Sequence, residues 1–167
     1  KLPKSADVED EDLRKLLKET EARGYKLETT EGSFFPVIDY ELYRQYQASV
    51  TEDMSAYIDI MALESNVPAV KDAGLVIPWS EIIERALTME SFLRDYPNSV
   101  KREDMQSLFD GYSFVTFKGI DNAPLFDYEN QTLLAEVKEA FTDAVSAGTD
   151  NSDFLATMKE FLELVEK

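Results

Sequence analysis

Apolar residues recur at steps of three and four along most of this chain, which is the spacing of helices with one buried side. The first stripe is Leu13, Leu16 and Leu17, and Arg23-Gly24 reads as the end of that helix. The same spacing predicts later helices over residues 40–50, from Thr51 toward Pro68, and over 80–96, 99–117, 132–147 and 153–166.

Residues Tyr25–Ile38 break this helical pattern. Tyr25, Leu27 and Thr29 alternate with polar neighbours, Glu31-Gly32 suits a turn, and a bulky apolar run follows. Pro36 has no N–H to donate, so the second strand should be at an edge or only partly paired. Since a lone hairpin is marginal in water, we expect its apolar face to pack on helices. The predicted fold is mainly α, a helical bundle of about six or seven helices with a short β-hairpin near the N-terminus.

Residues with short polar side chains precede most of the predicted helices. Asp7, Asp39, Thr51, Ser80 and Asp153 are therefore predicted N-caps. The acidic run Glu9 to Asp12 fits the positive end of the first helix dipole. A divalent cation is the alternative explanation of that run.

The chain length of 167 residues fits one domain, and no Gly/Ser/Pro-rich linker interrupts it. We therefore predict a single helical domain over 1–167, in which residues 1–8 are a loose segment and 25–38 a hairpin insert. A hydrophobic fraction of 44% is enough for a packed core.

The chain is strongly acidic, with 17 basic and 34 acidic residues and a net charge of −17. Such a surface repels phosphate backbones and anionic lipid headgroups, so nucleic acid is excluded as a partner class. No apolar run approaches the roughly 20 residues that span a bilayer. We expect a protein, peptide or glycan partner, and membrane contact only through an anchor outside this chain.

The chain contains no Cys and no His. This excludes thiol catalysis, imidazole bases and zinc held by thiolate or imidazole. We expect no cofactor, no metal and no catalytic residue. Two loops gather oxygen ligands that suit calcium, but neither has EF-hand spacing, and turn formation explains both. These loops hold Asp121, Asn122, Asp127 and Glu129, and Asp150, Asn151 and Asp153.

Aromatic residues concentrate between Tyr25 and Tyr57. This concentration has two interpretations. The rings pack between the hairpin and the helices, or some of the rings stay exposed and form a recognition surface. In the second case the predicted ligand-binding residues are Tyr25, Phe35, Asp39, Tyr40 and Tyr43.

Four segments together resemble an exported domain of Gram-positive bacteria, of unassigned activity and often lipid-anchored. They are "GYKLETTEGSFFPVIDYELY", "YIDIMALES", "FLRDYPNS" and "GIDNAPLFDY". The resemblance implies a helical, extracytoplasmic domain. The start at Lys1, without Met, suggests a leader or anchor removed ahead of it. "FLRDYPNS" also resembles the helix junction of tetratricopeptide repeats, although no second copy of that repeat is found.

These observations favour a non-enzymatic binding or interaction module at the bacterial cell envelope. One alternative is a carboxylate-dependent hydrolase of cell-wall glycan or peptide, with Asp39 among its acids. The other is a repeat-like helical scaffold for protein assembly.

Overall fold

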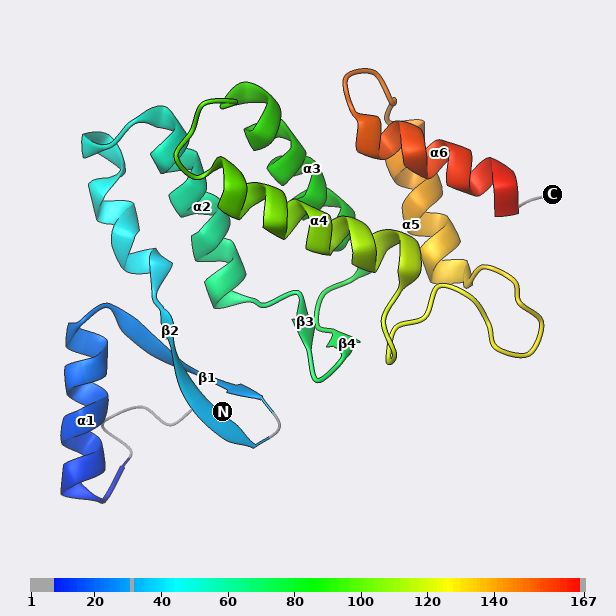
Figure 1. Cartoon of the computed structure of the whole chain (residues 1–167). Helices are drawn as coiled ribbons and strands as arrows, with labels where there is room; N and C mark the ends of the chain where they lie inside the picture. The colour runs from blue at the N-terminus through cyan, green and yellow to red at the C-terminus, as the bar shows by residue number, and fades with distance from the viewer. Residues whose placement is uncertain (1–7, 31, 166–167) are drawn as a thin grey trace. The chain divides into compact units, whose positions relative to one another are not determined.

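The computed structural model describes residues 8–30 and 32–165 (Figure 1). Cα packing divides the chain into two compact units, Lys1–Pro68 and Ala69–Lys167, and each is described by itself. The single domain over 1–167 stays a prediction. Apart from Val8, the predicted loose segment 1–8 and the Asp7 cap lie outside the described residues.

The first unit carries three helices and the predicted hairpin. Its elements are α1 (Glu11–Ala22), β1 (Tyr25–Thr30), β2 (Ser33–Ile38), the 3₁₀ helix η2 (Tyr40–Ser49) and α2 (Glu52–Asn66). β1 and β2 pair in antiparallel register from Tyr25 opposite Ile38 to Thr30 opposite Ser33. Asp10 caps α1, because its carboxylate accepts the Leu13 N–H at 2.8 Å.

The second unit is built from helix pairs. It contains the two-residue strands β3 (Val70–Lys71) and β4 (Gly74–Leu75), then α3 (Trp79–Asp95), α4 (Arg102–Lys118), α5 (Ala135–Ser146) and α6 (Asp153–Val165). α3 packs against both α4 and α5, and α5 also packs against α6. With six α-helices and one 3₁₀ helix among the described residues, the mainly helical fold and the hairpin near the N-terminus are confirmed.

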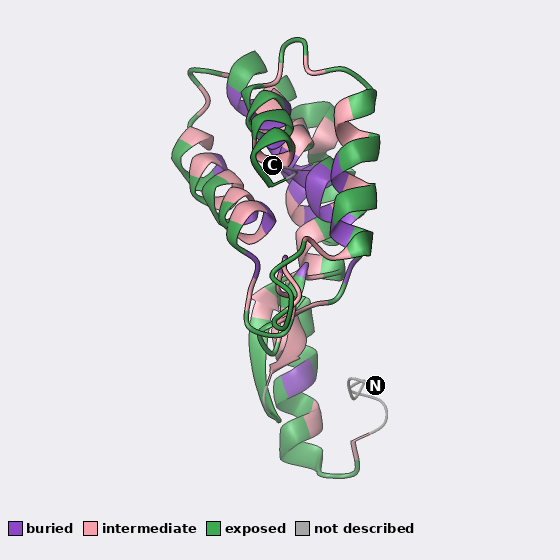
Figure 2. Cartoon of the chain, turned by 90° about the vertical axis from the view of Figure 1, so that its right-hand side faces the viewer, coloured by how far each residue is buried: buried purple, intermediate pink, exposed green. Residues whose placement is uncertain are grey.

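Phenylalanine rings fill the core of the second unit. Phe117 lies with its ring centroid 6.4 Å from Phe141, 5.4 Å from Phe154 and 6.0 Å from Phe161. Phe141 is fully buried. The buried positions follow the three- and four-residue spacing of α3, α5 and α6, and Figure 2 shows them as stripes on the inner sides of these helices.

A carboxylate of α3 fixes the start of α6. Glu90 accepts the Ser152 hydroxyl at 2.6 Å and the Phe154 N–H at 2.9 Å. Ser152 in turn accepts the Leu155 N–H at 3.0 Å and is the side-chain cap of α6. The predicted cap, Asp153, is instead the first helical residue.

Asp39 and Thr51 stand at the predicted N-cap positions of η2 and α2, whereas the predicted starts of α3 and α5 are wrong. Asp39 and Thr51 precede their helices but make no side-chain capping bond, and Thr51 donates its hydroxyl to Asp53. Ser80 lies inside α3, which begins after Pro78. α5 begins at Ala135 rather than residue 132, because Leu133 pairs with Phe126 in an isolated bridge.

The connection between α2 and α3 contains a second hairpin, formed by β3 and β4. Asp72 and Ala73 form its turn with φ of 50° and 57°. Asn122 holds this turn, since its side-chain amide donates to the Asp72 carbonyl at 2.9 Å and its backbone N–H to Ala73 at 3.0 Å.

Candidate binding surface

The predicted hairpin residues lie on different faces of the two-stranded sheet. Tyr25 is opposite Ile38, and Phe35 is opposite Glu28. Side chains alternate between faces along a strand, and residues directly opposite share a face. Tyr25 and Phe35 therefore point to opposite sides, and they do not frame one flat surface together. Both side chains remain exposed, as does Phe34 at 57%.

Asp39 stands at the N-cap position of η2, but its carboxylate is engaged with Lys26 instead of the first turn of the helix. Its backbone N–H donates to the Gly24 carbonyl at 2.9 Å, and its carboxylate lies 3.5 Å from the Lys26 ammonium. Its Oδ1 atom is buried without a hydrogen bond, so the ion pair with Lys26 is the contact that compensates it. The carboxylate thus joins the end of the hairpin to the start of η2.

Lys26 extends this connection to α2. Its ammonium donates to the Asn66 side chain at 2.6 Å and to the Ser65 hydroxyl at 3.2 Å. Three segments of the first unit meet at this one cation: β1, the end of β2 and the end of α2. The carboxylate of Asp39 therefore serves a structural ion pair, and this geometry gives no support to a role as a catalytic acid.

The 3₁₀ winding of η2 arranges its side chains in rows. A 3₁₀ helix has three residues per turn, so residues i and i+3 lie directly above one another. Tyr40, Tyr43 and Tyr46 form one such row, which we call the tyrosine ladder. The ring centroids of Tyr40 and Tyr43 are 5.8 Å apart, and those of Tyr43 and Tyr46 are 6.5 Å apart.

A second row of η2 attaches it to α2 through polar contacts. Glu41 accepts the Asn66 amide at 3.0 Å, Arg44 pairs with Asp59, and the Gln47 amide donates to the Ser55 carbonyl at 3.3 Å. Arg44 also donates to Glu41 at 3.1 Å. Because this row is engaged with α2, it sets the orientation in which the tyrosine ladder is presented.

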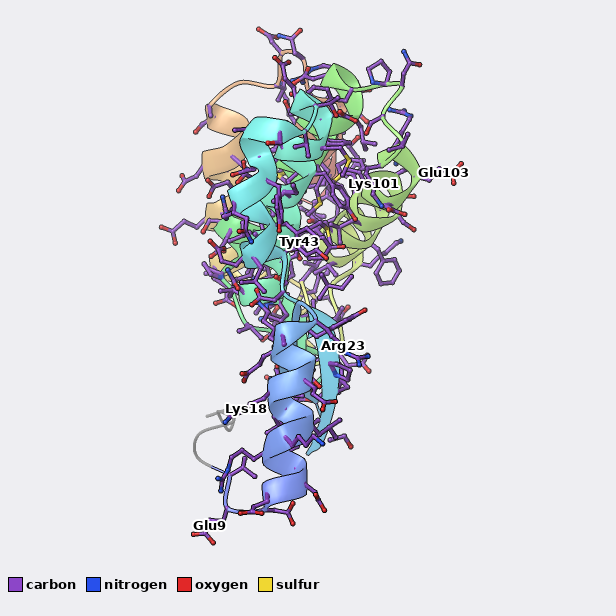
Figure 3. All side chains as sticks on the ribbon, turned by 90° about the vertical axis from the view of Figure 1, so that its left-hand side faces the viewer. Glu9, Lys18, Arg23, Tyr43, Lys101 and Glu103 are labelled. Carbon is purple, nitrogen blue, oxygen red and sulfur yellow. The ribbon has the colours of Figure 1, made fainter. Side chains whose placement is uncertain are left out.

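The ladder becomes more exposed along its length. Tyr40 is half-buried and contacts Tyr57 of α2 edge to face, with centroids 6.1 Å apart. Tyr43 is 42% exposed and Tyr46 is 54% exposed. Figure 3 shows Tyr43 on η2 and Arg23 at the end of α1, and a Cβ placed on Gly24 would lie 3.9 Å from the Tyr43 hydroxyl. The ladder therefore begins at Tyr40, which packs on Tyr57, and ends at Tyr46, which is exposed to solvent.

Two members of this arrangement were not among the predicted site residues: Tyr46, which extends the ladder, and Tyr57, which supports it. The signal for Tyr46 is the repeat Tyr-x-x-Tyr-x-x-Tyr at residues 40–46. The structure brings Asp39, Tyr40 and Tyr43 together and leaves Phe35 on the other side of the hairpin from Tyr25.

The hollows of each unit lie away from the predicted residues. One of about 430 Å³ follows α1 and is lined mainly by charged side chains, among them Arg14, Lys15 and Lys18. Another of about 290 Å³ in the second unit lies beside Trp79, Glu136 and Glu139. Ligand pockets for cofactors enclose the ligand, whereas the first hollow is formed by the surface side chains of a single helix and the second is lined by several carboxylates.

The oxygen ligands of the first loop, at Asp127 and Asn122, are engaged in hydrogen bonds within the protein. Asp127 accepts the Glu129 and Asn130 N–H groups at 2.9 and 3.0 Å, which is an Asx-type turn. Asn122 is engaged with the Asp72–Ala73 turn. Across residues 8–30 and 32–165, no group of three or more acidic side chains is arranged to hold a metal ion.

Comparison with protein-family models, curated proteins and solved structures finds no match to this chain. In the part of the chain that the structure describes, no helix is both long and apolar enough to cross a membrane.

Proposed function

We propose that this chain is a non-enzymatic binding module that acts at the bacterial cell envelope, and that the tyrosine ladder is its contact surface. The observation that carries the proposal is the exposure of Tyr43 and Tyr46 in one row, on a helix held by polar contacts to α2. Asp39 directly precedes the ladder, and its backbone N–H donates to the carbonyl of Gly24, the residue before Tyr25.

The chemistry of the ladder suits recognition. A tyrosine ring offers a large apolar area with only two side-chain torsions to fix, and its hydroxyl both donates and accepts hydrogen bonds. Aromatic residues with these properties dominate binding energy at interfaces. A row of rings that is already held in place loses little further entropy when a partner binds.

The extracytoplasmic location is the second part of the proposal. Its support is the resemblance of the four quoted segments to exported Gram-positive domains. The partner would then be a protein, a peptide or a glycan of the envelope, and the acidic surface favours a partner that is neutral or basic.

Cosedimentation with purified Gram-positive cell walls tests the proposal. The walls are used intact and after removal of their attached proteins, which separates a protein partner from a glycan. The wild type is compared with Tyr43→Ala/Tyr46→Ala and with Tyr128→Ala, which removes a tyrosine that is 75% exposed in the second unit. Far-ultraviolet circular dichroism confirms that each variant is folded.

We expect the wild type and Tyr128→Ala to sediment with the walls, and the double variant to bind at least about tenfold more weakly, since each exposed ring carries about 1 kcal/mol. If the double variant sediments as the wild type does, the ladder is not the contact surface. Failure of the wild type to bind either preparation would contradict the envelope assignment.

A further inference from the structure

We propose that the ligand of the tyrosine ladder is a basic, proline-rich segment in the polyproline II conformation. This inference rests on the proposed function of the ladder and names its class of partner. Three properties of the described residues support it: the spacing of the rings, the hydroxyl groups on them, and the local charge.

The first property is the spacing. The ladder presents rings at intervals of 5.8 and 6.5 Å, set by the roughly 6 Å pitch of a 3₁₀ helix. A polyproline II helix rises about 3.1 Å per residue, so residues two apart are separated by about 6.2 Å along its axis. A polyproline II helix has three residues per turn, so residues two apart lie on neighbouring edges of it. The two exposed rings, Tyr43 and Tyr46, can therefore contact two such residues on the edges that face the ladder.

The second property is hydrogen bonding. A polyproline II helix has no internal hydrogen bonds, so its carbonyl oxygens remain free to accept. Tyr43 and Tyr46 carry hydroxyl donors on exposed rings, which can satisfy such carbonyls while the rings pack on proline. Aromatic-lined surfaces use this combination to bind proline-rich segments, whose preformed extension keeps the entropy cost low.

The third property is charge. Residues 39–66 contain six acidic side chains and a single basic one, Arg44. Arg44 is shared between Glu41 and Asp59, and Lys26 of β1 pairs with Asp39. Together with Lys26, residues 39–66 carry six acidic and two basic side chains, so the neighbourhood of the ladder keeps an excess of negative charge. Basic residues between the prolines would be attracted to this field, and arginine would also stack on the tyrosine rings.

The geometry is less suited to an amphipathic helix as the ligand. A helical ligand needs a broad apolar groove that receives side chains from several turns. The ladder is one ring wide, because the neighbouring row of Glu41, Arg44 and Gln47 is polar and engaged with α2. A narrow row of rings is matched to a narrow, extended ligand.

The test measures fluorescence anisotropy of a fluorescein-labelled peptide of Pro-Pro-Arg repeats. A peptide of Gly-Gly-Arg repeats has the same charge without the polyproline II conformation, and Pro-Pro-Glu repeats have the conformation with the opposite charge. Each is titrated with the wild-type chain and with Tyr46→Ala, Tyr46→Phe and Tyr128→Ala. Tyr46 is suited to this test because it is the most exposed ring of the ladder and its truncation leaves the contact of Tyr40 with Tyr57 intact.

We expect saturable binding of the Pro-Pro-Arg peptide and affinity for the other two peptides that is at least about tenfold lower. Tyr46→Ala should weaken binding about tenfold and Tyr46→Phe about threefold, the latter from loss of one hydroxyl donor. Tyr128→Ala should remain within about twofold of the wild type.

Equal binding of the Gly-Gly-Arg peptide would show that charge alone is recognised and would overturn the inference, as would an unchanged affinity of Tyr46→Ala. The proposed function has a separate outcome. If retention on cell walls depends on Tyr43 and Tyr46 while the Pro-Pro-Arg peptide does not bind, the inference is wrong and the proposed function stands. If retention is also independent of these residues, both fail.

Discussion

The rings of Tyr43 and Tyr46 lie at 63° to one another with their centroids 6.5 Å apart, on consecutive turns of the same 3₁₀ helix. Runs of 3₁₀ helix longer than about four residues are uncommon, whereas η2 continues over 10 residues. Because a 3₁₀ helix has three residues per turn, tyrosines that recur every three residues lie in one continuous row. The backbone geometry of η2 is therefore the origin of the proposed contact surface.

Arg44→Ala should loosen η2 from α2. The substitution removes the ion pairs with Glu41 and Asp59 and leaves two carboxylates without their shared cation. Both pairs are well exposed, so we expect a loss of about 1 kcal/mol in the free energy of unfolding, measured by urea denaturation. The loss should shrink as salt concentration rises. Arg23→Ala is the control, an exposed arginine of the same unit, and an equal effect of the two substitutions would contradict this role of Arg44.

Gly24→Ala should destabilise the turn beside Tyr43. Gly24 has φ of +85°, a conformation that costs an L-residue about 1–2 kcal/mol. The same substitution at Gly111, an exposed position inside α4 with no atom near the added methyl group, should stabilise the protein by about 0.5–1 kcal/mol. Thermal unfolding of the two variants should therefore shift in opposite directions. A shift in the same direction would contradict the assigned backbone conformation of Gly24.

Glu90→Gln should weaken the start of α6. The charged carboxylate accepts the Ser152 hydroxyl and the Phe154 N–H at the positive end of that helix, and a neutral amide offers one acceptor oxygen instead of two. We expect a loss of about 1–2 kcal/mol in unfolding free energy. Glu84→Gln changes an exposed carboxylate of the same helix and should remain within about 0.5 kcal/mol. Equal stability of the two variants would show that Glu90 is not a cap.

Asp95 should titrate below the ordinary range of an aspartate. The Arg94 side chain donates a hydrogen bond to its carboxylate and Ser91 donates another, and both lower its pKa. A depressed pKa in the folded state means that this interaction contributes to stability at neutral pH and is lost as the pH falls through that pKa. Carboxyl carbon shifts followed by nuclear magnetic resonance give the pKa directly. It should rise toward the ordinary value in Arg94→Gln, and an unchanged pKa in that variant would refute the assignment.

The elements that could be predicted are those whose residue pattern lies within the element itself. The alternation from Tyr25 to Thr29 and the Glu31-Gly32 pair suffice for the hairpin, and the repeating apolar residues suffice for α3, α4 and α6. The winding of η2 could not be predicted in this way. A three-residue tyrosine spacing also fits one side of an α-helix, so this local pattern does not distinguish the two kinds of helix.

The missing capping bond of Asp39 likewise has a non-local cause. Asp39 is a favourable cap residue by type, but Lys26 lies 3.5 Å from its carboxylate and competes for it. The β3–β4 turn depends on Asn122, which is 50 residues away from Asp72. The predicted site also depended on a property that the local sequence does not give. Strand register, which the turn sets, decides whether Tyr25 and Phe35 lie on the same face of the hairpin.

Backbone nuclear Overhauser effects over residues 40–49 test the central claim most directly. A 3₁₀ helix should give contacts between the α-proton of each residue and the amide proton two residues later, together with ring-to-ring contacts between Tyr40 and Tyr43 and between Tyr43 and Tyr46. Continuous contacts from each α-proton to the amide proton four residues later would show an α-helix. That result would turn the three rings about the helix axis, break the ladder and contradict the proposed surface.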